Sequence, residues 1–291
     1  VSRMYTSPED MKRFLEDKEE TRPFLLCEYC HAMGNGPGDL EDYHEVFHSH
    51  ERFCGGFVWE WSDHAFSLGT TEDGKEKYGY GGDFGEPHND GNFCMDALTY
   101  PDRTPHTGLL ELKQVYRPVR VSKTEVAGEF EIKSLLGFAD AGEWLDCRYE
   151  ITYDGGVAAE GTIPFAVTPF GSTRVTVPEL AGVNGENSLV KEVSEKETYI
   201  RFIFTASKDM PYCRKGDEIC FDQLLLWEGT GNKQENETLS VLCEEGTFLI
   251  MVSCKSENGT ITYRFNKRIA AFDSIVCDGK ELLDRPMMFT E

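Results

Sequence analysis

The chain has 291 residues, of which 40% are hydrophobic, with 19 Phe, 12 Tyr and 4 Trp, and this composition argues against a disordered protein. Its 52 acidic and 29 basic residues give a net charge of −23, so the surface repels phosphate backbones and anionic lipids, and neither nucleic acid nor a membrane is expected as a partner. The sequence has no apolar run of about 18 residues that could span a bilayer, and residues 1–5 lack the apolar core of a signal peptide.

The first sixty residues alternate between helix and strand signals. Ser7 and Pro8 are typical of the first turn of a helix, and the apolar run behind Pro23 is typical of a buried strand in a parallel sheet. The predicted elements are a helix over 8–20, a strand over 23–28, a helix over 39–50 and a strand over 55–61. This order predicts βα units.

A glycine-rich stretch at 66–108 shows little periodicity and predicts a long functional loop, which a helix over 109–116 and then Pro118 follow. From residue 119 onward, alternating apolar and polar residues predict an all-β architecture. The predicted strands cover 130–133, 145–153, 199–204 and 219–221, then 248–252, 260–265 and 271–276, with a turn at 154–156 and a polar linker at 229–237. Strands at this spacing before the linker predict an immunoglobulin-like sandwich, whereas those after it are too few to complete another.

Cysteines and histidines are distributed very differently. The ten cysteines are scattered through apolar strings, which favours buried free thiols in a reducing compartment over a disulfide framework. Cys27 and Cys30 form a CxxC pair, but no second pair stands at zinc-ribbon spacing. All seven histidines precede residue 107, so the first part of the chain is the part equipped for chemistry.

Glu28 is the sharpest single candidate. It stands at the carboxyl end of the predicted strand 23–28 and precedes a glycine-containing loop. Catalytic residues of βα barrels lie at the carboxyl ends of strands, and a carboxylate there is costly to bury unless it is paired or used. A helix cap or a solvated acid is the alternative interpretation.

Four sequence blocks then occur in order within residues 22–118. They are CEYCHAMGN at 27–35, GGFVWEW at 55–61, YGGDFG at 80–85 with ND at 89–90 and FCM at 93–95, and DRTPH at 102–106. In order and spacing these blocks resemble the large bacterial β-galactosidases of glycoside hydrolase family 2.

The resemblance implies a multi-domain protein with an α/β part and all-β parts. Residues 1–117 are expected to be the C-terminal portion of a TIM (β/α)8 barrel, 118–228 an immunoglobulin-like β-sandwich, and 229–291 the start of a large β-sandwich. Both ends look cut, so the chain is expected to be an excised portion of a longer protein. That protein is expected to be a cytoplasmic, homo-oligomeric hydrolase of β-D-galactosides such as lactose.

The resemblance also implies roles for individual residues. It assigns Glu28 as the catalytic nucleophile, His31 and Trp59 as contacts of the galactosyl group, the backbone carbonyl of Phe93 and the side chain of Asp96 as ligands of Na⁺, and Asn89 as a neighbour of an outer Mg²⁺. Asp96 stands where the family carries an asparagine, and Cys30 stands where it carries an alanine. The main Mg²⁺ ligands are expected outside this chain.

Retaining glycosidases need two carboxylates about 5 Å apart, one as nucleophile and one as acid/base. From these residues alone Glu60, at the end of the next predicted strand, is the tempting partner of Glu28. The resemblance instead implies an acid/base glutamate upstream of Val1, so the isolated chain is expected to be inactive. Trp59 offers a flat apolar face to sugar C–H bonds, whereas Trp61 is expected in the core.

Three other interpretations stay open. Residues 44–48 match HExxH, the pattern of a zinc peptidase helix. Residues 119–291 could serve purely as scaffold that braces the barrel and builds subunit contacts. The β-sandwich could alternatively bind carbohydrate, in which case Trp144 or Trp227 would supply the stacking platform.

Overall fold

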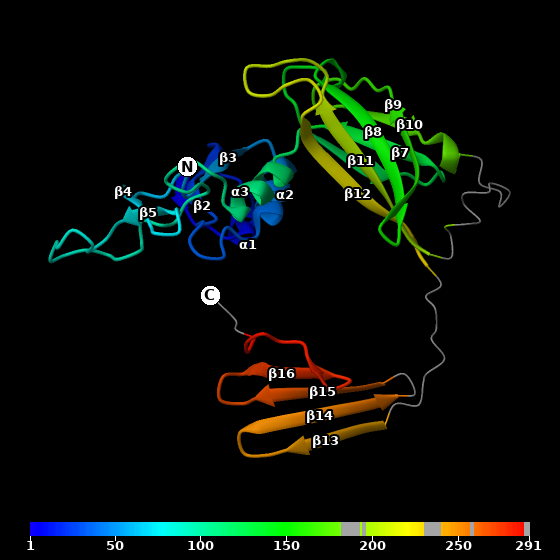
Figure 1. The fold of residues 1–291 in the computed structure, drawn as a ribbon. Helices are drawn as coiled ribbons and strands as arrows, with labels where there is room; N and C mark the ends of the chain where they lie inside the picture. Colours follow the sequence, from blue (N-terminus) through cyan, green and yellow to red (C-terminus); the bar gives the residue numbers. More distant parts are fainter. Residues whose placement is uncertain (182–192, 194–195, 230–239, 257–258, 288–291) are drawn as a thin grey trace. The chain divides into compact units, whose positions relative to one another are not determined.

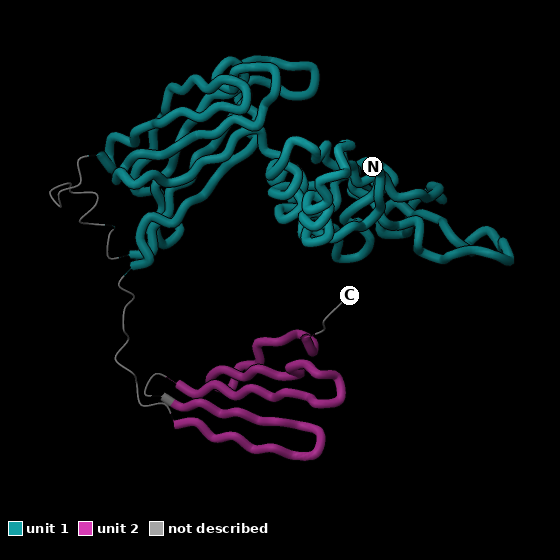
Figure 2. Tube along the Cα trace, turned by 180° about the vertical axis from the view of Figure 1, so that it is seen from behind, with its two compact units in different colours: residues 1–229 teal, residues 230–291 magenta. Residues whose placement is uncertain are grey.

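The computed structural model describes residues 1–181, 193, 196–229, 240–256 and 259–287. The chain divides into two compact units, residues 1–229 and residues 230–291, which Figure 2 shows in separate colours. Each unit is described by itself below. The predicted linker at 229–237 lies, apart from its first residue, outside the described residues.

The first unit begins with a small parallel sheet covered by helices (Figure 1). The strands run in the order β1 (Ser2–Met4), β2 (Phe24–Tyr29) and β3 (Phe53–Val58), and the helices are α1 (Pro8–Phe14), α2 (Leu40–Ser49) and α3 (Thr107–Val115). Both strand pairs are parallel, which confirms the predicted βα units. The apolar side chains of β2 and of the helices share one core, which fixes where the carboxyl end of β2 emerges.

Helix α1 is shorter than the predicted 8–20. Ser7 caps its start by accepting a hydrogen bond from the Asp10 amide at 3.2 Å, as predicted, but the helix ends at Phe14. The Asp17 carboxylate accepts hydrogen bonds from the next amides, at Glu19 (3.0 Å) and Glu20 (3.3 Å). A local carboxylate acceptor of this kind competes with the helical hydrogen bonds and stops the helix.

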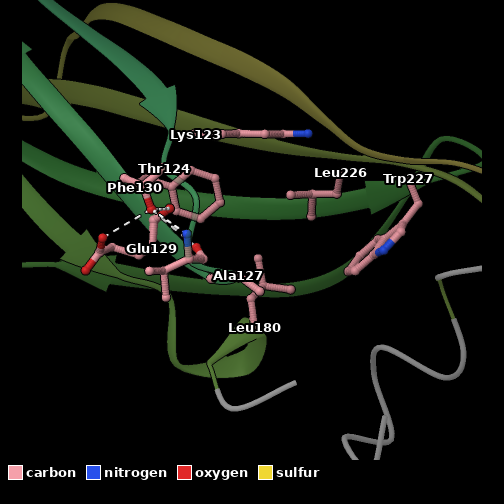
Figure 3. Close-up of a pocket in the computed structure, with 10 residues that line it drawn as sticks. Lys123, Thr124, Ala127, Glu129, Phe130, Leu180, Leu226 and Trp227 are labelled. Atoms are coloured by element: carbon pink, nitrogen blue, oxygen red, sulfur yellow. Dashed lines mark hydrogen bonds between the residues drawn. The ribbon is translucent and has the colours of Figure 1, made fainter. Parts of the chain in front are cut away.

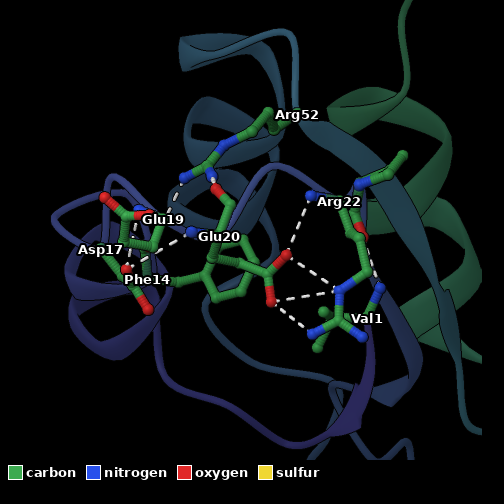
Figure 4. A network of polar contacts seen from close by, with 8 residues as sticks. Val1, Phe14, Asp17, Glu19, Glu20, Arg22 and Arg52 are labelled. Carbon is green, nitrogen blue, oxygen red and sulfur yellow. Dashed lines mark hydrogen bonds and ion pairs between the residues drawn. The ribbon is translucent and has the colours of Figure 1, made fainter.

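The segment after α1 is held by a polar network (Figure 4). The Glu20 carboxylate accepts the Arg22 Nε–H at 2.9 Å, and this arginine lowers the pKa of Glu20 to about 2. Arg52, which precedes β3, donates to the Glu20 carbonyl and, at 3.3 Å, to the Phe14 carbonyl. The network therefore ties the end of α1 to the start of β3.

The glycine-rich stretch contains a hairpin that the sequence did not predict. Strands β4 (Phe66–Thr70) and β5 (Glu76–Gly79) pair antiparallel. Every residue of β4 is exposed, so the strand lacks the in–out alternation that predicts a strand from sequence.

The described residues between Pro118 and Gly229 form two antiparallel sheets. The strand order of the first sheet is β10 (Ser172–Thr176), β7 (Glu129–Ser134), β6 (Val119–Lys123). The strand order of the second sheet is β12 (Glu218–Glu228), β11 (Glu197–Ala206), β8 (Leu145–Tyr153), β9 (Gly156–Ile163). Short 3₁₀ turns lie at Ala141–Glu143 and Pro178–Leu180. Their inward side chains share one core, which Phe130, Ile151 and Phe202 fill. A β-sandwich is thereby confirmed, although β6, β9 and β10 were not predicted as strands.

The predicted turn at 154–156 is a tight hairpin between β8 and β9. Asp154 and Gly155 both adopt positive φ, 48° and 77°. Two consecutive positive φ values define the turn that matches the twist of a hairpin, which explains an Asp-Gly pair at this point.

The second unit is a single antiparallel sheet within its described residues. Its strands follow the chain order β13 (Ser240–Glu245), β14 (Leu249–Ser256), β15 (Gly259–Asn266), β16 (Ala271–Cys277) and β17 (Lys280–Glu281). The three predicted strands are found, and β13 and β17 are additional.

A polar junction joins α2 and α3 to the sandwich within the first unit. It consists of Glu41, His44, Arg117, Arg120 and Asp222. Arg117 pairs with Asp222 at 3.0 Å, Arg120 pairs with Glu41, and the Asp222 carboxylate also accepts the Val121 amide at 2.7 Å. Two residues of α3, Lys113 and Gln114, donate to carbonyls of β12. Helices of the α/β part and a strand of the sandwich are therefore one packed block.

His44 makes this junction sensitive to acid. Its ring is 7% exposed, and the Arg120 Nη2 lies 3.0 Å from its Nδ1. Because a guanidinium only donates, Nδ1 accepts and the ring is neutral. Burial, followed by the charge of Arg120, lowers the pKa of His44 from 6.5 to about 4.

A histidine with a lowered folded pKa stabilises the fold above its unfolded pKa, and this contribution is lost as the pH falls from 6.5 toward 4. We expect the free energy of unfolding to drop between pH 7 and pH 4 by about 3 kcal/mol more in the unmodified chain than in His44→Gln, whose amide oxygen can still accept from Arg120. Urea denaturation at a series of pH values measures this difference. Parallel pH profiles of the two proteins would contradict it.

The cysteines depart in part from the predicted burial. All ten are free thiols, but only Cys147 and Cys220 are buried, while Cys27, Cys54 and Cys243 are exposed. The exposed members lie on strand faces that no other layer of the described chain covers, so an apolar neighbour in sequence did not imply burial. No helix in the described ranges has the length and apolar character needed to span a bilayer.

Candidate active site

Glu28 is the penultimate residue of β2, and it lies beside the end of β1. Its backbone carbonyl accepts the Tyr5 amide at 2.9 Å, and its half-buried carboxylate faces the Tyr5 phenol. Burial and then the hydrogen bond to Glu28 raise the pKa of Tyr5 to about 12. The phenol therefore stays a hydrogen-bond donor at neutral pH, and it faces the Glu28 carboxylate.

Asp96 brings together two other predicted site residues. Its Oδ2 lies 3.0 Å from the Trp59 Nε1, which donates to it, and 3.1 Å from the His31 Nε2. Asp96 is only 3% exposed, and its Oδ1 is buried without a hydrogen-bond partner in the described part of the chain. Side chains from two other segments thus meet at the Asp96 carboxylate.

Aromatic rings link this cluster to Glu28 and to Phe93. The His31 ring lies 6.2 Å from the Tyr5 ring and 5.7 Å from the Phe93 ring, between centroids. The Phe93 ring is 59% exposed and the Trp59 ring 38%. Glu28, Tyr5, His31 and Phe93 consequently form a continuous surface at the carboxyl end of the parallel sheet.

A pocket of about 390 Å³ opens next to this surface. Its lining residues are Trp59, Glu60, His64, Gly81, Asp90, Gly91, Phe93, Cys94 and Asp96. The Glu60 Oε1 lies 3.5 Å from the His64 Nε2. Burial, with the nearby charge of Asp96, raises the pKa of Glu60, although His64 opposes the shift. Glu60 therefore lines this pocket beside Asp96.

The loop that carries Asp96 is fixed by a second carboxylate, which the sequence did not single out. Buried Asp63 accepts the Ala97 amide at 3.0 Å and lies 2.9 Å from the His106 Nε2. His106 stacks on Tyr100 with centroids 3.7 Å apart. The pairing ties the segment after the strand motif to the DRTPH block. An aspartate two residues after the strand motif was the available signal.

Trp61 is not in the core, contrary to expectation, since its side chain is 62% exposed. Its backbone carbonyl accepts both the amide and the hydroxyl of Thr99, so the backbone and not the indole is the anchoring group. The peptide bond between Trp59 and Glu60 is cis.

The two side chains expected near cations, those of Asp96 and Asn89, have different surroundings in the structure. The unpaired, buried Asp96 Oδ1 is a vacant acceptor of the kind that a hard cation uses. Asn89 lies apart from this cluster, and its side chain is engaged with the Gly91 amide (3.0 Å) and the Glu86 carbonyl (3.3 Å). Within the described residues no three His, Cys, Asp or Glu side chains converge as metal ligands. The Asn89 side chain is thus bonded within its own loop, and the outer Mg²⁺ expected near it stays a prediction.

Residues of the rival interpretations have other surroundings. In the HExxH segment, His44 directs Nδ1 to Arg120, where a zinc ion would meet a positive charge. In the sandwich, the Lys208 ammonium lies 4.2 Å over the Trp144 ring. Trp227 lines a pocket of about 220 Å³ with Leu180 and Leu226, shown in Figure 3. These aromatic faces are partly covered by neighbouring side chains.

The turn after Glu28 depends on Gly36. A Cβ at Gly36 would overlap the His31 carbonyl oxygen, whereas a Cβ at Gly38 would meet nothing within 4 Å. We expect Gly36→Ala to lower the free energy of unfolding by about 1–3 kcal/mol, as overpacking does, and Gly38→Ala to leave it nearly unchanged. Chemical denaturation of both variants measures the difference. Equal stabilities would contradict the described turn.

Two family models match most of the first unit. The family model described as "Glycosyl hydrolases family 2, TIM barrel domain" matches residues 1–121, and the one described as "Beta-galactosidase, domain 4" matches residues 130–227. The chain therefore belongs to glycoside hydrolase family 2.

Relatives named β-galactosidases match nearly all of the chain. The chain is 37% identical to a β-galactosidase of Actinobacillus pleuropneumoniae over 99% of this chain and 27% of that protein, and 34% identical to one of Staphylococcus xylosus over 95% and 27%. It is thus a relative of the β-galactosidases and spans about a quarter of their length. A β-glucuronidase structure of Bacteroides uniformis shares 15% identity with this chain, over 77% of this chain and 25% of that one. Its TM-score of 0.26 is too low to show a shared fold.

Proposed function

We propose that this chain is the nucleophile-bearing part of a retaining β-galactosidase that hydrolyses terminal β-D-galactosides such as lactose. The observation that carries the proposal is the position of Glu28. It lies at the carboxyl end of a parallel strand, in contact with Tyr5 and beside the cluster of Asp96, His31 and Trp59. Membership of the family and the names of the relatives support the substrate class.

In this reaction the ionised Glu28 carboxylate forms a bond to the anomeric carbon of the galactosyl group while the bond to the leaving oxygen breaks. The leaving oxygen takes a proton from an acid that this chain does not supply. Water then attacks the galactosyl-enzyme and releases galactose together with the free carboxylate. Tyr5 holds its proton and orients Glu28 throughout, because the pKa of its phenol is raised to about 12.

The sugar lies against the exposed part of the Trp59 ring, where C–H bonds meet an aromatic face, and His31 contacts its hydroxyls. Sodium, when bound at Asp96 and the Phe93 carbonyl, supplies a positive charge for a sugar hydroxyl. Glu60 shapes the pocket wall. Asn89 and an outer Mg²⁺ remain expectations from the family resemblance alone.

The proposal includes the domain boundaries 1–117, 118–228 and 229–291, with an immunoglobulin-like middle domain and a scaffold role for residues 119–291. It further places the whole enzyme in the cytoplasm as a homo-oligomer. The isolated chain is inactive in this proposal, since it holds one of the two required carboxylates. Turnover of nitrophenyl β-galactoside by the purified 291-residue chain, abolished by Glu28→Gln, would contradict this last point.

Covalent labelling of the whole enzyme tests the assignment. A 2-deoxy-2-fluoro-galactosyl substrate with a good leaving group traps the galactosyl-enzyme, because the fluorine slows its hydrolysis. Peptide mass spectrometry is expected to find the label on Glu28, with no label after pretreatment with excess galactose. A label on any other residue would overturn the proposal.

A further inference from the structure

The carboxylate of Asp96 receives two side chains on one oxygen. Trp59 donates its indole N–H to Oδ2 at 3.0 Å, and the His31 Nε2 lies 3.1 Å from the same atom. Asp96 is more than nine-tenths buried, and Oδ1 has no hydrogen-bond partner among the described residues. The contacts span 37 and 65 residues of sequence, so no local structure enforces them.

The residue type matters for this geometry. An asparagine has one acceptor oxygen, and its amino group only donates. If that oxygen faced Trp59 and His31, the amino group would take the place of Oδ1 and could accept nothing. If the amide were flipped, an N–H would face the indole N–H. Only a carboxylate accepts at Oδ2 and keeps a second acceptor at Oδ1.

We infer that Asp96 is a positioning residue that sets the orientation of both Trp59 and His31 through its Oδ2. Because one atom holds both rings, a sugar that displaces the Trp59 ring also changes the hydrogen bond of His31. The functional meaning of these orientations rests on the proposed function, whereas the hydrogen bonds themselves do not.

The indole N–H signals of the 291-residue chain test the inference by ¹H–¹⁵N NMR. The chain has four tryptophans, and Trp59→Phe identifies the Trp59 signal. In the unmodified chain the Trp59 indole N–H is expected to exchange with water about tenfold more slowly than that of exposed Trp61, because it is bonded to a charged acceptor. In Asp96→Leu, which removes both acceptors at similar volume, this protection is lost and the Trp59 signal moves upfield. Asp96→Asn gives an intermediate shift.

Asp102→Asn is the matched control, because it changes an exposed carboxylate of the same loop and leaves the Trp59 signal in place. An unchanged Trp59 signal and exchange rate in folded Asp96→Leu would overturn the inference. Should Asp96→Leu fail to fold, the unmodified chain still decides, since equal exchange of Trp59 and Trp61 also overturns it. A Trp59 signal that depends on Asp96, combined with a fluorosugar label away from Glu28, would uphold the inference and reject the proposed function.

Discussion

Glutamine in place of Glu28 is expected to lower kcat of the whole enzyme on nitrophenyl β-galactoside on the order of 10⁴-fold, which is the scale seen when a catalytic nucleophile is removed. Glutamine keeps the shape of the side chain and can still accept the Tyr5 hydroxyl, so the fold and the neighbouring ring are expected to stay in place. What is lost is the negative charge that attacks the anomeric carbon. Steady-state kinetics with matched circular dichroism spectra measures the effect.

Glu60→Gln is the control, because it removes another half-buried carboxylate of the same site. Its kcat is expected to fall by less than about 10²-fold, the lower bound for losing a general acid or base. Sodium azide separates the roles further. In Glu28→Gln it attacks the sugar in place of the missing carboxylate and yields galactosyl azide of inverted anomeric configuration. A larger loss of kcat in Glu60→Gln than in Glu28→Gln would contradict the assignment of Glu28 as the nucleophile.

The elements that the sequence predicted are those with strong local signals. Strand β2 is bounded by a proline and fully apolar at its start, and the β8–β9 turn needs Asp154 and Gly155. The elements that escaped prediction carry weak signals. Strands β1 and β13 are exposed throughout, so burial against a core sets neither of them apart, and their pairing depends on neighbouring strands. The predicted helix over 8–20 is longer than α1, because Asp17 acts through a side-chain hydrogen bond that helix propensity does not include.

For the site, the motif blocks predicted which residues matter but not how they touch. Nothing local to Trp59 or His31 indicates that both reach Asp96, since that contact needs two loops and a strand end in their final places. Tyr5 was not singled out at all, because its role follows from the parallel pairing of β1 with β2. Contacts between distant segments are decided by tertiary packing, which periodicity within a segment cannot contain.

Asp222→Asn is expected to lower the free energy of unfolding of the first unit by about 3 kcal/mol, the lower end of the usual cost of breaking a buried ion pair, because Arg117 keeps a second pair with Glu41 at 3.7 Å. Asparagine can keep the hydrogen bond to the Val121 amide, so the loss comes from the Arg117 charge, whose side chain is mostly buried. Burial raises the pKa of Asp222 even though Arg117 opposes the shift. Desolvation thus outweighs the attraction within the pair, and the pair fixes geometry more than it adds stability.

The same reasoning predicts a partial rescue. Arg117→Met combined with Asp222→Asn removes both charges, and the double variant is expected to be more stable than Asp222→Asn alone. Glu218→Gln is the control on the same strand, because its pair with Arg201, at 3.4 Å, is largely exposed and is expected to contribute less than about 1 kcal/mol. Urea denaturation of the four proteins measures these terms. Equal losses in Asp222→Asn and Glu218→Gln would show that the junction is solvated, and the helices and the sandwich would then not unfold as one block.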